Sequence, residues 1–318
     1  MTAPRATLNA RAHAIAQQLV EDATAAKVNI ETIGKATVVD CGVATVGSLK
    51  AGHALAEACI GGMGRIAFGM DRLGSRPCGK ITVEVDEPVA ACLLSQYAGW
   101  ELSLGDYFAM TSGPMRIRRG KEPLFEKIKY TETTRVAVGV LESSKLPTEE
   151  VIKHICDEIN ILPASLILLV ARTASIAGSY QVVARSVETC MHKLFELQFP
   201  NRIVAASGTA FLPPIPKDDL TAIGRTNDSI LYGGEVVMWV EGDDEPIERL
   251  GPLVPSCASS DYGEPFASIF ERAGRDFYQI DANLFSPASV LFNNVQTGSS
   301  YHFGNIDETL LERSFFEL

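Results

Sequence analysis

Arg185 and Glu188 are the charged pair in this sequence whose types and spacing could carry out acid–base chemistry. They follow residues 173–181, a stretch rich in small side chains that would let a ligand approach the backbone closely. If residues 180–197 form one helix, Gln181 and His192 lie on the same arc as the pair. Apolar side chains occupy an opposed arc, so the helix has one face for packing and one for polar contacts.

The Arg185–Glu188 pair has two interpretations. An exposed ion pair three residues apart on a helix contributes a few tenths of a kcal/mol, and the spacing alone favours this reading. In a cleft, Glu188 could act as the general base for a water molecule, with Arg185 adjusting the carboxylate and facing developing charge. The sequence leaves both interpretations open.

Four further side chains are candidates for a binding pocket. Ser175 lies in the small-residue stretch, and Tyr97 is the last residue of a predicted helix. Arg225 and Asp228 belong to residues 224–228, which we predict as a polar loop between a helix and a strand. A structural turn with no binding role is the alternative for that loop.

Other familiar reaction centres find little support. The seven cysteines are an odd number, are far apart and form no C-x-x-C pair, which indicates reduced structural thiols. The histidine spacing matches no zinc motif, so we expect no metal, and no G-x-S-x-G elbow is present. A cysteine hydrolase using Cys41 or Cys257 stays open, but it requires an activated thiol and a nearby histidine.

Composition indicates a folded globular protein that avoids nucleic acid. The 318 residues are 46% hydrophobic and 21% charged, and the formal net charge of -11 repels phosphate backbones. The longest apolar stretch, residues 161–171, contains Pro163 and Ser165 and is shorter than the roughly 20 residues of a membrane helix. The first residues lack the pattern of a secretory signal, so we expect a cytoplasmic protein that does not contact membranes.

Alternating patterns along the chain predict an α/β (or α+β) fold. Strand and helix patterns succeed each other from residue 136 in the order β-α-β-α-β, which is typical of a parallel or mixed sheet covered by helices. The predicted helices are residues 6–26, 48–63, 88–97, 148–160, 180–197 and 266–272. The predicted strands are residues 28–32, 36–40, 80–85, 136–141, 165–172, 202–206, 230–241 and 289–295.

Chain length and one proline-rich segment predict two lobes. At 318 residues the chain exceeds the size for which one hydrophobic core suffices. Residues 213–216, Pro-Pro-Ile-Pro, cannot lie inside a helix and indicate a rigid connector. We therefore predict a first lobe over residues 1–212 and a second over 213–318, with an approximate boundary and segments that can interleave.

The sequence resembles the methenyltetrahydromethanopterin cyclohydrolase family along nearly its whole length. The resemblance rests on separated segments whose combination is specific. They are VDCGV (39–43), SQYAGW (95–100), YFAM (107–110) with SGP (112–114), TASIAG (173–178), AR and VET within 184–189, MHKL (191–194), IGRTND (223–228), YGG (232–234), and DYG with PF within 261–266.

The resemblance implies a fold, an assembly and a reaction. It implies a two-lobed α/β subunit that forms a homotrimer, with a pterin substrate between the lobes and no metal or coenzyme. It also implies hydrolysis of the cyclic methenyl amidinium to the formyl form, with Arg185 and Glu188 matching the family's R-x-x-E segment at the reaction centre. A noncatalytic pterin-binding protein on the same scaffold is the alternative.

One segment departs from the family pattern. Small residues commonly follow the proline of the SGP motif, whereas this chain continues with Met-Arg-Ile-Arg-Arg. Arg116, Arg118 and Arg119 could form a site for an anionic tail of the substrate, or they could belong to an exposed loop. The sequence favours neither reading.

Overall fold

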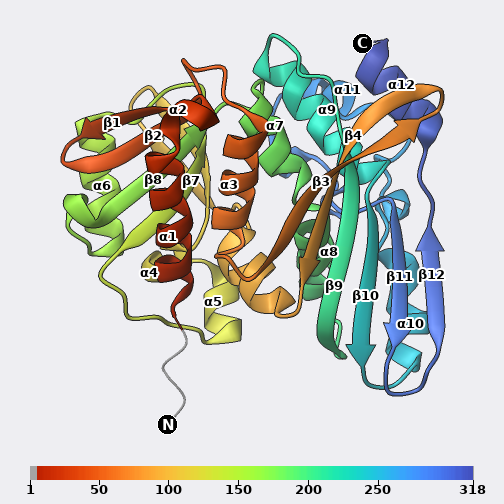
Figure 1. The fold of residues 1–318 in the computed structure, drawn as a ribbon. Helices are drawn as coiled ribbons and strands as arrows, with labels where there is room; N and C mark the ends of the chain where they lie inside the picture. Colours follow the sequence, from red (N-terminus) through yellow and green to blue (C-terminus); the bar gives the residue numbers. More distant parts are fainter. Residues whose placement is uncertain (1–5, 318) are drawn as a thin grey trace. The chain divides into compact units, whose positions relative to one another are not determined.

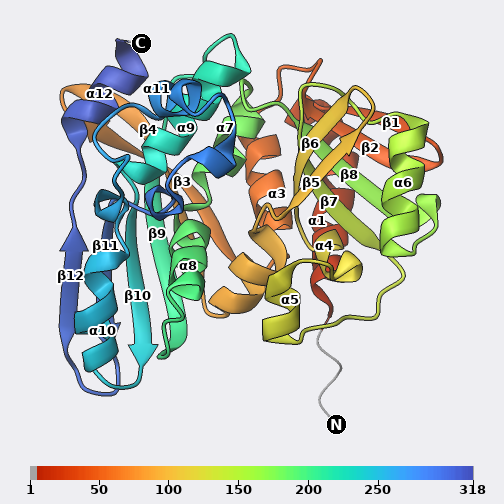
Figure 2. The same ribbon diagram turned by 180° about the vertical axis from the view of Figure 1, so that it is seen from behind.

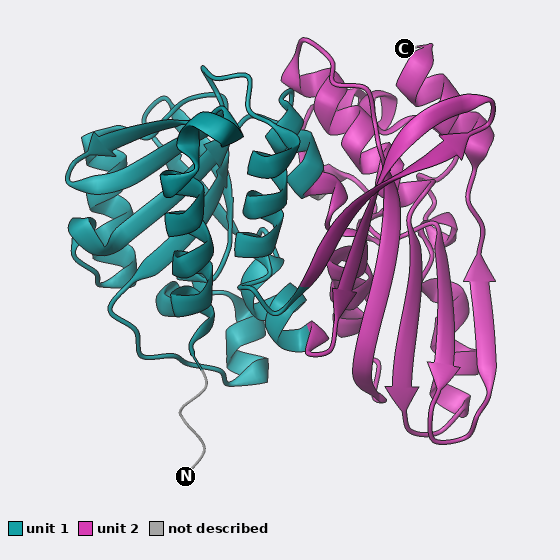
Figure 3. Ribbon diagram, in the orientation of Figure 1, with its two compact units in different colours: residues 1–64, 89–181 teal, residues 65–88, 182–318 magenta. Residues whose placement is uncertain are grey.

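The computed structural model describes residues 6–317, which form two compact units that interleave along the chain (Figure 3). Within the described residues, unit 1 comprises 6–64 and 89–181, and unit 2 comprises 65–88 and 182–317. The division differs from the predicted one because residues 65–88 and 182–212 belong with the C-terminal sheet. The proline-rich segment 213–216 lies inside unit 2 and separates no lobes.

Unit 1 is built on a six-stranded mixed sheet with the order β1-β2-β8-β7-β6-β5 (Figure 1). The central strands β2, β8 and β7 are parallel, and antiparallel pairs complete both edges. The strands are β1 (Asn29–Ile33), β2 (Ala36–Gly42), β5 (Trp100–Leu104), β6 (Tyr107–Ser112), β7 (Ala137–Glu142) and β8 (Leu166–Ala171).

Helices cover both faces of this sheet. The α1 and α3 helices lie over one face, and α6 lies over the other (Figures 1 and 2). Strand β8 is buried throughout: Ile167 and Leu169 pack on the α1/α3 side, while Leu168 packs on the α6 side. The helices of this unit are α1 (Leu8–Glu21), α2 (Ala23–Ala26), α3 (Leu49–Cys59), α4 (Met115–Arg119), α5 (Pro123–Ile128) and α6 (Glu149–Ile159), with a π-helix at Val89–Gln96 and a 3₁₀ turn at Pro163–Ser165. Helix α7 (Ile176–Val183) begins in unit 1, and its last two residues belong to unit 2.

Unit 2 contains a second six-stranded mixed sheet, with the order β12-β11-β10-β9-β4-β3. Strands β10 and β11 are parallel, whereas β4–β9, β9–β10 and β11–β12 are antiparallel. These two sheets confirm the predicted α/β class. The strands are β3 (Gly64–Leu73), β4 (Arg76–Val85), β9 (Arg202–Leu212), β10 (Glu235–Glu241), β11 (Ser289–Asn294) and β12 (Ser300–Gly304).

The helices of unit 2 form two groups. Helix α8 packs against β9 and β10, and α9 packs against β9, α11 and α12. The second group encloses a cluster of buried aromatic and aliphatic side chains that includes Phe266, Phe270 and Phe315. The helices are α8 (Ser186–Glu196), α9 (Asp219–Leu231), α10 (Glu245–Leu250), α11 (Phe266–Arg272) and α12 (Glu308–Phe316), with 3₁₀ turns at Gly251–Leu253, Ser256–Ala258, Phe277–Gln279 and Ala282–Leu284.

Four sequence predictions are corrected by the structure. The predicted helix 180–197 is two helices, α7 and α8, and the predicted helix 88–97 is a π-helix. The predicted polar loop 224–228 lies within α9, which begins where the Asp218 carboxylate accepts a hydrogen bond from the Thr221 amide. The helix continues through these polar residues to Leu231, so the predicted strand 230–241 begins only at Glu235.

Asp40 fixes the chain at the carboxyl end of β2. Its buried carboxylate accepts hydrogen bonds from the amides of Gly42, Val43 and Ala44 at 3.0, 2.7 and 2.9 Å. One side chain thereby satisfies the amide of Gly42, the last residue of β2, and two amides beyond the strand.

We predict that Asp40→Ala destabilises the protein by about 2 kcal/mol or more, because it leaves these amides without their acceptor. Urea unfolding followed by circular dichroism measures the loss. Asp106→Ala, at an exposed turn position, is the matched control and should leave the unfolding midpoint unchanged. Equal midpoints for the two variants would contradict the assignment.

Candidate functional site

Arg185 and Glu188 lie at the start of helix α8. Helix α7 ends at Val183 and α8 begins at Ser186, so Arg185 is the N-cap residue and Glu188 lies in the first turn. Gln181 belongs to α7 and therefore shares no helical face with the pair. The helix dipole favours a negative charge at the position of Glu188.

The pair is buried. Arg185 Nη1 lies 3.7 Å from Glu188 Oε2, and the two residues are only 8% and 5% exposed. These values exclude the exposed surface ion pair that the spacing favoured. Burying two charges is costly unless they are paired, so the geometry couples the two side chains closely.

A close approach of helix and sheet sets the position of the pair within unit 2. A Cβ atom at Gly208 on β9 would lie 2.7 Å from Ser186 Oγ and 2.9 Å from a methyl group of Val187. The absent side chain therefore lets the first turn of α8 lie directly on the sheet. One turn beyond the pair, the buried Lys193 Nζ bonds Asn283, and burial lowers the pKa of this amine.

Ser175 has a structural function in unit 1. Its hydroxyl donates to the Arg172 carbonyl at 2.7 Å and accepts from the Gly178 amide at 3.0 Å. These bonds shape the turn that leads from β8 into α7. Tyr97 is also in unit 1, directly after the π-helix, and is half-buried.

Arg225 and Asp228 connect α9 to other parts of unit 2. The Arg225 guanidinium donates to the carbonyls of Ser314 and Pro214, and burial lowers its pKa. Asp228 is buried and accepts from the Phe266 amide at 2.8 Å and from Ser314 Oγ at 2.5 Å. Burial raises the pKa of Asp228 to about 7.

Among the six predicted residues, the structure brings Arg185 and Glu188 together. Tyr97 and Ser175 belong to unit 1, and the other four belong to unit 2. Ser175, Arg225 and Asp228 make hydrogen bonds that hold their own units together. These contacts give them structural functions whether or not they also bind a ligand.

The basic segment after Pro114 is neither an exposed loop nor a cluster of unpaired cations. Residues 115–119 form α4, in which Arg116 is fully buried against Glu122. Arg118 donates to the carbonyls of Ile159, Thr134 and Asn160. Arg119 bonds Glu158 and lies 4.5 Å from the Trp100 ring centroid. The chain itself thus occupies all three guanidinium groups.

A polar cluster at the carboxyl edge of the parallel strands was missed from the sequence. Glu142, at the end of β7, accepts hydrogen bonds from Thr173 Oγ1 and from Gln181 Nε2. Parallel β7 and β8 bring their carboxyl ends together, and such edges commonly bind ligands. The sequence contained a sign of this cluster, because a polar residue, Glu142 or Thr173, directly follows each of the predicted strands 136–141 and 165–172.

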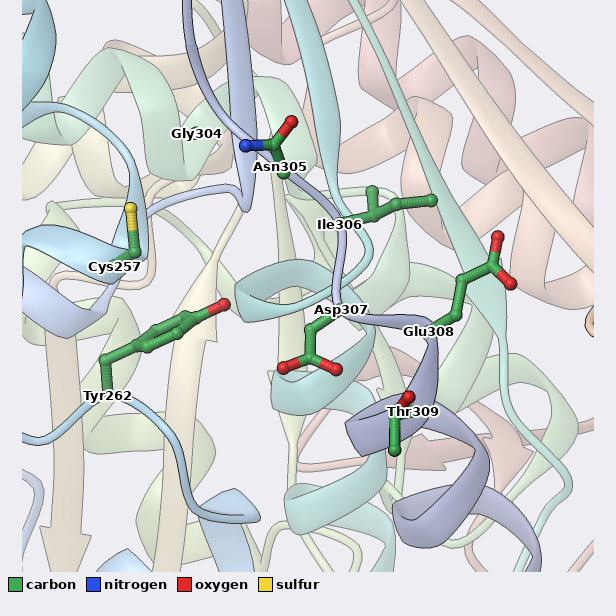
Figure 4. Close-up of a pocket in the computed structure, with 8 residues that line it drawn as sticks. All are labelled: Cys257, Tyr262, Gly304, Asn305, Ile306, Asp307, Glu308 and Thr309. Atoms are coloured by element: carbon green, nitrogen blue, oxygen red, sulfur yellow. The ribbon is translucent and has the colours of Figure 1, made fainter.

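A cavity of about 450 Å³ lies in unit 2, and its lining includes Cys257 but none of the six predicted catalytic and binding residues. Figure 4 shows Cys257 and Tyr262 on one side and residues 304–309 on the other. No histidine lines it. Cys41 is fully buried, which raises the pKa of its thiol. Neither cysteine therefore has the surroundings that a nucleophilic thiolate requires.

Two other features are absent from the described residues. Within residues 6–317, no helix has the length and apolarity required to cross a membrane. Among the same residues, His, Cys, Asp and Glu side chains form no group of three or more that could hold a metal ion.

Comparison with known proteins identifies the family. The model of the family described as "Cyclohydrolase (MCH)" matches residues 7–315. A methenyltetrahydromethanopterin cyclohydrolase of Rhodopirellula baltica is 46% identical over 290 residues, which cover 89% of this chain and 87% of that protein. The chain belongs to the methenyltetrahydromethanopterin cyclohydrolase family. Membership confirms the predicted resemblance and enzyme class.

Relatives in this cyclohydrolase family come from bacteria and archaea. The cyclohydrolase of Methylobacillus flagellatus is 39% identical over 311 residues, covering 97% of this chain and 95% of the relative. That of Methanocaldococcus jannaschii is 38% identical over 320 residues, covering 97% and 98%. The similarity therefore extends through both units.

The raised pKa of Asp228 predicts a pH-dependent stability. The folded carboxyl binds its proton more tightly than the unfolded one, with pKa values of about 7 and 3.8, so its favourable contribution is lost as the pH rises between these values. The slope reaches at most about 1.4 kcal/mol per pH unit. Burial raises the pKa of the neighbouring Tyr232, which stays neutral throughout this range.

We expect Asp228→Asn, which cannot ionise, to gain stability relative to the native chain as the pH rises from 5 to 8. Urea unfolding of both proteins at several pH values measures this difference, in which the contributions of unchanged groups largely cancel. A difference independent of pH would show that the Asp228 carboxyl has no raised pKa.

Proposed function

We propose that this member of the cyclohydrolase family hydrolyses methenyltetrahydromethanopterin to formyltetrahydromethanopterin. The observation that carries the proposal is the buried Arg185–Glu188 pair at the first turn of α8. The names of the relatives supply the substrate. The homotrimeric assembly that the resemblance implies and the cytoplasmic location expected from the sequence belong to the same proposal.

Glu188 serves as the general base in the proposed reaction. The methenyl carbon is part of a cationic amidinium, which a carboxylate attracts and water attacks. The water oxygen bonds to this carbon as Glu188 removes one proton. One carbon–nitrogen bond then breaks, the hydroxyl proton is lost and the leaving nitrogen gains a proton. The products are the neutral formyl compound and one proton released to solvent.

Arg185 orients the carboxylate and limits its affinity for protons. At 3.7 Å from Glu188, its charge favours the ionised form that can accept a proton from water. Its guanidinium also provides donors for an oxygen that develops negative charge. Tyr97 is proposed to contact the substrate, with Ser175, Arg225 and Asp228 as further binding candidates that also support the fold.

We predict that Glu188→Gln lowers turnover by about 10²- to 10⁴-fold, the range for loss of a general base. The measurement is the rate at which the methenyl absorbance disappears, with circular dichroism to establish that the fold is intact. Glu196→Gln is the matched control, because Glu196 lies on the same helix with its side chain 61% exposed. Normal turnover by a folded Glu188→Gln protein would exclude the proposed base.

The same absorbance separates an enzyme from a noncatalytic pterin-binding protein. With substrate in large excess over protein, an enzyme lowers the methenyl absorbance until equilibrium is reached, whatever the protein concentration. A binding protein changes the spectrum only in proportion to its own concentration. We expect the native chain to convert many substrate molecules per protein molecule, and a stoichiometric change without turnover would support the alternative.

A further inference from the structure

Arg116 is a fully buried cation held within unit 1. Its Nε donates to Glu122 Oε1 at 2.9 Å, and its Nη2 forms an ion pair with Glu122 Oε2. Its Nη1 donates to the carbonyl of Ser95 at 3.2 Å and lies 3.5 Å from that of Leu94. The guanidinium carbon is 5.2 Å from the Tyr97 ring centroid.

We propose that Arg116 and Glu122 are positioning residues that fix Tyr97 for substrate binding. This inference rests on the proposed function. It extends that function to Arg116 in the basic segment and to Glu122 in the loop that follows. Neither side chain is proposed to touch substrate. They act through Tyr97 and through the backbone that precedes it.

The backbone before Tyr97 depends on Arg116 for its hydrogen bonds. The π-helix Val89–Gln96 ends there, and the last carbonyls of a helix have no partner within it. Ser95 O accepts from Arg116 and from the Gly113 amide, so α4 and the turn before it complete the helix end. The direction in which the chain leaves the π-helix is thereby set.

The Glu122 carboxylate contacts the loop that follows Tyr97. A Cβ atom at Gly99 would contact the Glu122 carboxylate and would lie 2.5 Å from Cε1 of Tyr97. Gly99 is therefore packed tightly between the Tyr97 ring and the Glu122 carboxylate. A change at Glu122 therefore loosens the packing at Gly99, two residues after Tyr97.

Stability alone is a poor explanation for this ion pair. Burying two charges costs several kcal/mol per ion, and well-packed apolar replacements are often neutral or stabilising. What an apolar pair lacks is the directional bonding of a guanidinium to two carbonyls and a carboxylate. The arrangement thus favours a defined geometry at Tyr97.

The charge balance beside Tyr97 has a consequence for ligand choice. The methenyl substrate is a cation and the formyl product is neutral, so an uncompensated cation beside the ring disfavours the substrate more than the product. In the native chain Glu122 neutralises Arg116 at hydrogen-bond distance. Removing only the negative charge of Glu122 should therefore weaken binding of the methenyl substrate more than binding of the formyl product.

The test measures KM and kcat in both reaction directions for three variants. Arg116→Met with Glu122→Leu removes the pair together, and we expect KM to rise about tenfold in both directions, with an unfolding midpoint equal to or above that of the native chain. Glu122→Gln leaves the cation, and we expect KM to rise more for the methenyl form than for the formyl form. Arg118→Met is the control; it loses bonds to Ile159 and Thr134 and should lose stability while keeping both KM values.

Native KM values in a folded double variant would overturn the positioning role, and equal effects of Glu122→Gln in both directions would overturn the charge-balancing role. If the double variant does not fold, Arg116→Lys keeps the charge without the planar fork and should still raise KM. Failure of the native chain to turn over substrate would instead contradict the proposed function. In that case, dissociation constants of the methenyl form, measured from the change in its absorbance on binding, test the positioning role of Arg116 and Glu122 in the same variants.

Discussion

The site depends on two opposite charges held out of water at the first turn of α8. Such a pair persists only where partner groups replace the lost hydration, and the start of a helix provides part of that replacement through its dipole. The pair also requires that α7 end at Val183 and that α8 begin against the sheet, where Gly208 leaves room. The break between α7 and α8, the close packing at Gly208 and the ion pair therefore depend on one another. A change in any of them moves the Glu188 carboxylate.

The sequence predicted the elements that have strong periodicity, and it failed where the backbone changes direction without a marker. Strand β8 and helix α6 were evident because apolar spacing and an N-cap threonine define them. The interruption at Ala184 and Arg185 has no glycine or proline. The helical periodicity therefore predicted one continuous helix where the structure has two. Residues 224–228 were predicted as a loop because polar residues resemble turns, whereas Thr226 satisfies its hydroxyl within the helix by bonding the Ala222 carbonyl.

Candidate residues could be selected by type, but their surroundings required the structure. Arg185 and Glu188 were correctly paired from spacing, yet only the coordinates show that they are buried. The three arginines of residues 116–119 resemble an anion site in the sequence, while the fold pairs each with partners at distant positions such as Glu158 and Asn160. Glu142 shows the reverse case, because its significance comes from a parallel strand neighbour that no local pattern reveals.

The interleaved chain imposes an order in which the two sheets can form during synthesis. All strands of the first sheet have left the ribosome once residue 171 has emerged, so that sheet can form early and locally. Strand β4, made before residue 86, pairs with β9, whose residues 202–212 follow more than a hundred positions later. The β3–β4 segment must therefore wait as an unpaired edge during translation, and such edges are where aggregation begins. This segment carries charged residues, among them Arg65, Asp71, Arg72 and Lys80, and charged side chains on an edge strand disfavour its pairing with other chains.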